Sequence, residues 1–183
     1  DRVIFNLSNN QKLIYNDIRK FGFIKIVKRV NLDQNFHLRH LGPEPLSNRF
    51  NQKYFKYYII GKERTIKDLL MDQKFISGLG NIYVNEILFF SRVKPNKKIK
   101  DLSNNEIKEI IKLTKKVITK AIILGGSSIK DFSSVSGKKG SFQQHFSVYG
   151  KTGKKCIIKN CRGIIKKIVI SNRSTFYCAK CQK

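Results

Sequence analysis

The residues with the clearest chemistry are four cysteines, all close to the C-terminal end of the chain. They form two pairs, Cys-x4-Cys at Cys156 and Cys161 and Cys-x2-Cys at Cys178 and Cys181, with sixteen residues between the pairs. This order is typical of a tetrahedral zinc site that takes two thiolates from each of two turns. Two disulfides are the alternative, and the opening residues, which show no export signal, count against them. No His, Asp or Glu lies between the cysteines, so the prediction is one structural zinc ion rather than a catalytic one.

The segment between the two cysteine pairs must hold this site. Its β-branched runs, residues 164–170 and 174–177, predict a β-hairpin that depends on the metal for stability. Lysines and Arg173 on this hairpin would form a rigid platform for phosphate groups.

Before the cysteine region, the chain changes from a strand-like to a helical pattern. Alternating apolar residues predict about three strands over residues 3–30, and two prolines in residues 41–46 predict a rigid linker. Helical periodicity follows as far as about residue 131, with Thr65 as a helix N-cap and Ser103 and Glu106 as a capping box. Gly125 and Gly126 end the long helix, and residues 133–142 are predicted to be a loop. The expected domains are therefore residues 1–45, 46–146 and 147–183.

The charge of the chain points to a polyanionic partner. The net charge of the 183 residues is +26, with 38 Lys and Arg against 12 Asp and Glu. Nucleic acid is the expected partner, although the codon bias of an AT-rich genome would also raise the lysine content. No window is apolar enough to span a membrane. We therefore expect a cytoplasmic protein with no membrane partner, acting as a monomer.

The helical middle, residues 66–90 (IKDLLMDQKFISGLGNIYVNEILFF), closely resembles the helix-two-turn-helix core of the bacterial formamidopyrimidine-DNA glycosylases. Other matching motifs follow the same order along the chain: DIRKFG at 17–22, HLGPEPL at 40–46, GGSSIKDF at 125–132, VYGKTGKKC at 148–156 and RSTFYCAKCQK at 173–183. The resemblance covers essentially the whole chain. It implies an α+β fold made of the end of an N-terminal β-sandwich, a helix-two-turn-helix domain and a C-terminal zinc-binding β-hairpin. The related endonuclease VIII branch shares the helical core and the hairpin, but HLGPEPL and KDF favour the former family.

The resemblance also implies roles for individual residues. Arg19 would contact the orphaned base, Phe21 would insert beside it, and Lys20 stands where the family usually has arginine. Gly80 and Asn81 open a helix whose free amides attract phosphate, and a tight interhelical turn is the alternative for this glycine-rich motif. The remaining matches are the zinc-hairpin Arg173, which grips phosphate and is assigned to the last elimination step; Lys67, near the lesion; Glu86, near the active centre; Arg64 or Lys62 as a further phosphate contact; and Lys138, in the loop that closes over an oxidised purine.

One family feature has no counterpart in this sequence. Family enzymes open with a proline and a glutamate, and the proline amine is the nucleophile, whereas this chain opens with Asp1 inside the region that matches the N-terminal domain. We therefore expect a fragment, the C-terminal two-thirds of a bifunctional glycosylase and AP lyase that removes oxidised purines and nicks the strand by β,δ-elimination. The expected partner is double-stranded DNA with oxidised bases or abasic sites. The alternatives are a non-catalytic zinc-hairpin nucleic-acid-binding protein and an endonuclease VIII-like glycosylase for oxidised pyrimidines.

Overall fold

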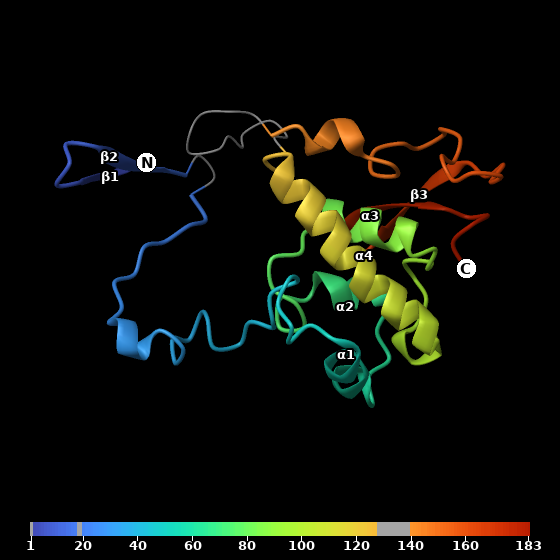
Figure 1. Ribbon diagram of the computed structural model, residues 1–183, viewed down its shortest axis with the longest axis horizontal. Coiled ribbons are helices and arrows are strands. Elements are labelled where there is room, and N and C mark those ends of the chain that lie inside the picture. Colours follow the sequence, from blue (N-terminus) through green and yellow to red (C-terminus); the bar gives the residue numbers. More distant parts are fainter. Residues whose placement is uncertain (1, 18–19, 128–139) are drawn as a thin grey trace. The chain divides into compact units, whose positions relative to one another are not determined.

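The computed structural model describes residues 2–17, 20–127 and 140–183 (Figure 1). The chain divides into two compact units, residues Asp1–Arg39 and His40–Lys183. The mixture of helices with two small antiparallel sheets confirms the expected α+β class.

The first unit is a β-hairpin followed by irregular chain. Strands β1 (Arg2–Asn6) and β2 (Lys12–Asn16) pair in an antiparallel register in which Ile4 faces Ile14. The expectation of three strands is wrong, because residues 20–28 form no strand. The carboxylate of Asp17 accepts the backbone N–H groups of Lys20 (3.0 Å) and Gly22 (2.6 Å), and this local turn removes donors that a third strand would need. The 3-10 helix η1 (Arg29–Asn31) follows.

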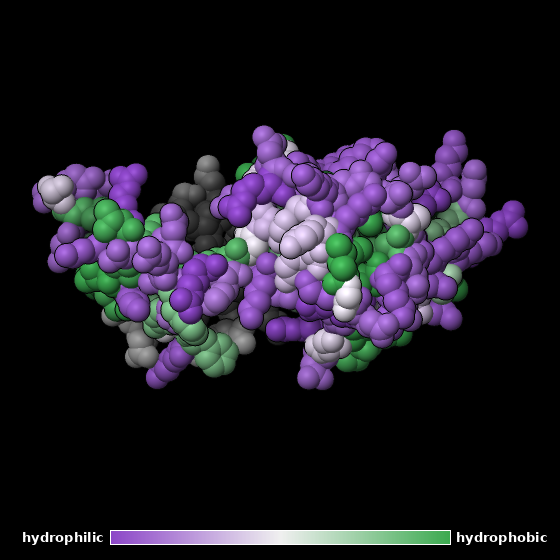
Figure 2. All heavy atoms as spheres, turned by 90° about the horizontal axis from the view of Figure 1, so that it is seen from below, coloured by the Kyte–Doolittle hydropathy of each residue, from purple (hydrophilic) through white to green (hydrophobic). Residues whose placement is uncertain are grey.

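Hydrophobic side chains of this hairpin are exposed. Phe5 is 40% exposed and Ile14 is 52% exposed. Both are residue types that favour strands, so they form the hairpin without being buried by it. Figure 2 shows green hydrophobic residues among hydrophilic ones at the end of the chain that holds β1 and β2. A two-stranded hairpin has too little area to bury its own apolar side chains.

The second unit contains the helices α1 (Gln52–Ile59), α2 (Ile66–Met71), α3 (Asn81–Phe90) and α4 (Asn104–Ile123), with the 3-10 helices η2 (Ile99–Asp101) and η3 (Phe142–His145) (Figure 1). Their ends follow the expected signals. The Thr65 hydroxyl accepts the N–H of Asp68, and Ser103 and Glu106 form a capping box that starts α4. Gly125 and Gly126, both at positive φ, end it.

Helix α3 lies at the centre of the second unit and packs against α2, α4 and the last strand of the chain. The core around it is apolar and fully buried, with Phe50, Phe55, Phe75, Ile87 and Leu88 all at 0% exposure. The proline-containing linker also belongs to this unit. Its Gly42 donates an N–H to Gln73 O (2.8 Å), and a Cβ on Gly42 would lie 2.4 Å from Phe75 O. This close approach explains why the second compact unit begins at His40, ahead of the domain boundary predicted after residue 45.

The chain ends in the hairpin of β3 (Ile165–Ile170) and β4 (Arg173–Cys178). Ser171 and Asn172, both at positive φ, form the two-residue turn, which suits the twist of the strands. The small core of the hairpin includes Phe89 of α3, so the hairpin and the helices share buried surface. Among the described residues, no helix is both long and apolar enough to span a bilayer.

Candidate metal centre and nucleic-acid interface

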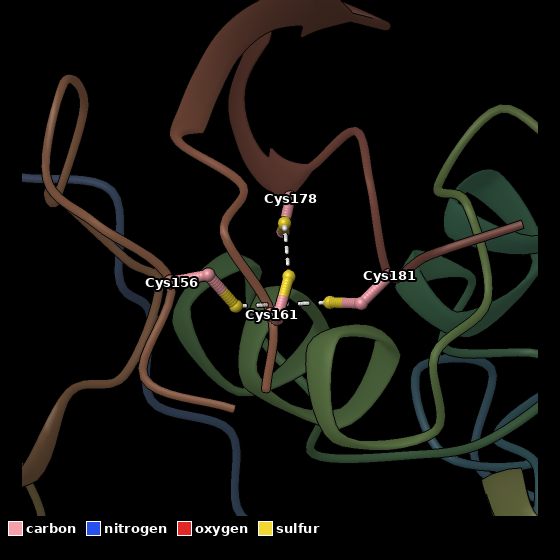
Figure 3. Close-up of side chains that lie close together, drawn as sticks. All are labelled: Cys156, Cys161, Cys178 and Cys181. Atoms are coloured by element: carbon pink, nitrogen blue, oxygen red, sulfur yellow. Dashed lines mark hydrogen bonds between the residues drawn. The ribbon is translucent and has the colours of Figure 1, made fainter. Parts of the chain in front are cut away.

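The four cysteine sulfurs converge on one point beside the hairpin (Figure 3). All four Sγ atoms lie within 4.8 Å of one another, and Cys156–Cys181 and Cys161–Cys178 are each separated by 3.7 Å. These separations are well beyond a disulfide bond of about 2.05 Å and fit thiolates around one tetrahedral ion. A Cβ on Gly163 would lie 2.5 Å from Cys178 Sγ, so the turn beside the site requires glycine. The arrangement is that of a closed, structural zinc site.

The zinc hairpin is joined to the end of α3 by hydrogen bonds that the sequence did not predict. Gln182 is fully buried, and its side chain accepts the N–H of Cys178 and donates to Val93 O, both at 2.8 Å. Lys183 exchanges backbone hydrogen bonds with Lys94 and Arg92. The metal site therefore braces the helical unit as well as the hairpin.

Three of the predicted site residues come together where β4 meets the helices. Arg173, the exposed first residue of β4, is followed by Ser174, whose carbonyl oxygen accepts from Asn81 Nδ2 (3.0 Å) and Lys67 Nζ (3.4 Å). Asn85, one turn further along α3, accepts the N–H of Phe176 at 2.6 Å. Side chains from the first turns of α2 and α3 thus hold the backbone next to Arg173 through hydrogen bonds.

The N-terminus of α3 lies at this junction. Its N-cap is Gly80, and the cap makes no side-chain hydrogen bond. Gly78 takes a positive φ of 81°, whereas the Cβ position of Gly80 has nothing within 4 Å. The turn therefore needs Gly78 for its conformation. Gly80 has open space at its Cβ position and provides no side-chain cap, so the first amides of α3 can favour a phosphate group.

Lys67 is only 1% exposed, whereas Arg173 is exposed. The pKa of Lys67 is lowered to about 8, chiefly by burial; the charge of Asp68 opposes this change, and the charge of Arg173 contributes to it. Its ammonium group donates to Thr175 Oγ1 as well as to Ser174 O. Lys67 therefore lies beneath β4, at the edge of the groove that Arg173 also lines, with its ammonium group bonded to the strand.

Arg64 and Lys62, predicted as alternative phosphate contacts, have intramolecular partners. The Arg64 guanidinium pairs with Asp72 (2.6 Å) and donates to Asp68 O (2.8 Å), although Arg64 lines the same groove as Arg173. Lys62 lies 3.4 Å from the centre of the Tyr58 ring and lines a different hollow. The structure does not bring Lys62 together with Arg173.

Two family models match the chain: the formamidopyrimidine-DNA glycosylase H2TH domain at residues 41–133, and a zinc finger found in FPG and IleRS at residues 153–183. The chain belongs to the formamidopyrimidine-DNA glycosylase family. It is 45% identical to the formamidopyrimidine-DNA glycosylase of Rickettsia bellii and 39% identical to that of Roseobacter denitrificans, covering all of this chain and 66% and 65% of those proteins. The chain therefore spans about two-thirds of the length of its relatives. The zinc-finger match and the converging sulfurs confirm the predicted structural zinc site.

Solved structures of the family agree with the fold. The MutM (Fpg) protein of Thermus thermophilus superposes with a TM-score of 0.87 at 32% identity, over 98% of this chain and 67% of that one. The Lactococcus lactis Fpg in complex with abasic-site DNA superposes with a TM-score of 0.84 at 36% identity, over 94% of this chain and 62% of that one. The fold predicted from the resemblance is therefore confirmed.

The remaining formamidopyrimidine-DNA glycosylase motifs fall partly outside the described residues. Arg19 and Lys138 lie there, as does most of the loop 133–142. Phe21, in the first unit, is 78% exposed, and Lys20 beside it has a positive φ of 57°. The C-terminal end of the loop is fixed to the end of α4, because Phe142 donates its N–H to Gly126 O at 3.1 Å.

Glu86, predicted near the active centre, is buried at 1% exposure on α3. Its carboxylate accepts three backbone N–H groups, those of Ser147, Val148 and Tyr149, at 2.9–3.1 Å. A catalytic role for Glu86 stays a prediction. The contacts give it a structural task, which is to hold the segment that leads into the zinc hairpin.

Replacing this carboxylate is expected to destabilise the family fold strongly. Glu86→Ala would leave three amide groups unpaired, so we expect the free energy of unfolding to fall by about 3 kcal/mol. Glu109→Ala, at an exposed helix position paired with Lys112, is the matched control and should change stability by less than about 0.5 kcal/mol. Urea denaturation followed by circular dichroism measures both, and equal losses would contradict this role for Glu86.

Proposed function

We propose that the complete protein is a bifunctional DNA glycosylase and AP lyase of base-excision repair, and that this chain carries its damaged-DNA-binding part. The substrate is double-stranded DNA with oxidised purines such as 8-oxoguanine and formamidopyrimidines. The observation that carries the proposal is the junction of an exposed Arg173, the open N-terminus of α3 and a metal-braced hairpin. Solved structures of the Lactococcus lactis relatives, which contain DNA with an abasic site or Fapy-dG, support the same substrate class.

Each part of the chain has a task in this proposal. Arg173 and the amides of α3 hold phosphates beside the lesion, since a guanidinium fork and a helix N-terminus both favour phosphate oxygens. Arg19 and Phe21 fill the space of the extruded nucleotide, and the loop with Lys138 closes over the base. By the family resemblance, an N-terminal proline amine displaces the base to form an imine, β-elimination follows, and Arg173 assists the last, δ-elimination step.

The function is tested by base release and strand nicking with the complete protein on duplexes that contain 8-oxoguanine or an oxidised pyrimidine. We expect release of 8-oxoguanine and a nick with phosphate at both ends. Preference for the pyrimidine would favour the endonuclease VIII-like alternative, and binding without base release would favour a non-catalytic binder. As such repair acts on chromosomal DNA, we place the protein in the cytoplasm, where thiols also stay reduced.

Arg173 should contribute more to DNA binding than an ordinary surface cation. Arg173→Ala removes a phosphate contact held on a rigid hairpin, so we expect about tenfold weaker binding and a salt slope reduced by about one unit. Lys112→Ala on α4 removes the same charge at an exposed position and is the matched control. Equal effects of the two changes, measured by fluorescence anisotropy across a salt series, would show that the charge acts only as a diffuse field.

A further inference from the structure

We propose that Lys67 is a positioning residue for Arg173, acting through the hydroxyl of Thr175, and that Lys67 does not itself touch DNA. The inference deepens the proposed function and rests on it. Family resemblance puts this lysine near the lesion. In the structure Lys67 lines the same groove as Arg173, but it is only 1% exposed and its ammonium group is bonded to β4.

The direction of the hydrogen bonds supports this role. Thr175 is fully buried, and its hydroxyl donates to the carbonyl oxygen of Arg173 at 3.0 Å. Since a hydroxyl has a single proton, Thr175 must act as the acceptor toward the Lys67 ammonium group. Lys67 is therefore linked to the backbone carbonyl of Arg173 by two hydrogen bonds that meet at the Thr175 hydroxyl.

Neighbouring contacts fix the same stretch of backbone on both sides of Arg173. Lys67 also donates to Ser174 O at 3.4 Å, and Asn81 donates to the same oxygen at 3.0 Å. On the other side, the turn residue Ser171 donates its hydroxyl to the carboxylate of Asp68 at 2.6 Å. Arg173 thus projects from a strand held at its turn and at its next two residues, while Arg173 itself stays exposed.

A rigid base matters because a guanidinium gains its full binding energy only when both N–H···O bonds can form at once. Without Lys67, the Thr175 hydroxyl would lose a buried partner, and β4 would be free to shift relative to α2. The loss would appear as weaker phosphate binding by Arg173, without the removal of any group that contacts DNA.

A double-mutant cycle on the 183-residue chain separates the two roles. Lys67→Met should weaken binding to a duplex with an abasic-site analogue about fivefold in the parent chain, and by less than about twofold when Arg173→Ala is already present. Equal weakening in both backgrounds would show that Lys67 contacts DNA independently, which would overturn the proposal.

A second pair of variants keeps the test valid if Lys67→Met does not fold. Thr175→Val removes the hydroxyl at nearly constant volume, and Thr175→Ser retains it, so only the valine variant should reproduce the loss. Equal behaviour of the two variants would contradict the relay. Zinc content and melting temperature are measured alongside, to show that the hairpin remains intact.

A readout without DNA distinguishes failure of this inference from failure of the proposed function. The NMR order parameter of the Arg173 Nε–H group should fall in Lys67→Met and Thr175→Val and stay at the parent value in Thr175→Ser. If the chain did not bind DNA but these order parameters changed as expected, the proposed function alone would fail. Unchanged order parameters in all variants would overturn the positioning role.

Discussion

Loss of zinc is expected to unfold the C-terminal hairpin and to abolish tight DNA binding. Structural zinc supplies about 10–16 kcal/mol in zinc-finger peptides, and this hairpin has only a small core of its own. Cys178→Ser removes a fully buried ligand at the end of β4, so the variant should lose stoichiometric zinc and the amide protection of residues 165–178. The long helix α4 should remain, because its contacts lie with α1 and α3.

The matched control for this change is Ala179→Ser, which introduces the same side chain at the next, exposed position. It should retain zinc and bind DNA like the parent chain. Because Lys183 and Gln182 bond to residues 92–94, we also expect protection to fall at that turn when zinc is lost. Atomic absorption and hydrogen exchange measure these effects, and full zinc retention by Cys178→Ser would contradict the four-thiolate site.

The second large effect is expected at Phe89, where the helices meet the hairpin. Its ring is fully buried among Val148, Ile165 and Phe176, so Phe89→Ala opens a cavity and should lower the free energy of unfolding by about 4 kcal/mol. The next residue, Phe90, is 37% exposed, and Phe90→Ala is the matched control with a much smaller loss. Equal losses in urea denaturation would show that the hairpin does not depend on α3.

The sequence predicted the features that depend on local spacing. The structure confirms the Thr65 cap and the Ser103–Glu106 capping box, whose residues bond to neighbours a few positions away. It also confirms the grouping of the four cysteines, which is set by a single ion. The family resemblance supplied the order of the helical domain and the zinc hairpin along the chain. Together with the local signals, it was enough to assign the zinc ligands and Arg173 to the C-terminal hairpin.

The sequence could not predict which polar side chains are buried. Lys67 and Glu86 look like ordinary exposed helix residues, because their partners lie more than sixty residues further along the chain. Gln182 gave no signal for the same reason. The prediction of a third strand was wrong. The alternation of apolar residues over 20–28 does not reveal that the Asp17 carboxylate accepts two of the backbone N–H groups in this segment.

The most direct test of the account is the binding selectivity of the 183-residue chain. Its affinity for a duplex with one abasic-site analogue is compared with its affinity for the same duplex undamaged, across a salt series. We expect steep salt dependence in both cases and about tenfold or tighter binding to the damaged duplex, because a vacated stack costs less to open than an intact one. Equal affinity for the two duplexes at every salt concentration would contradict the claim that this chain carries the damaged-DNA-binding part of a glycosylase.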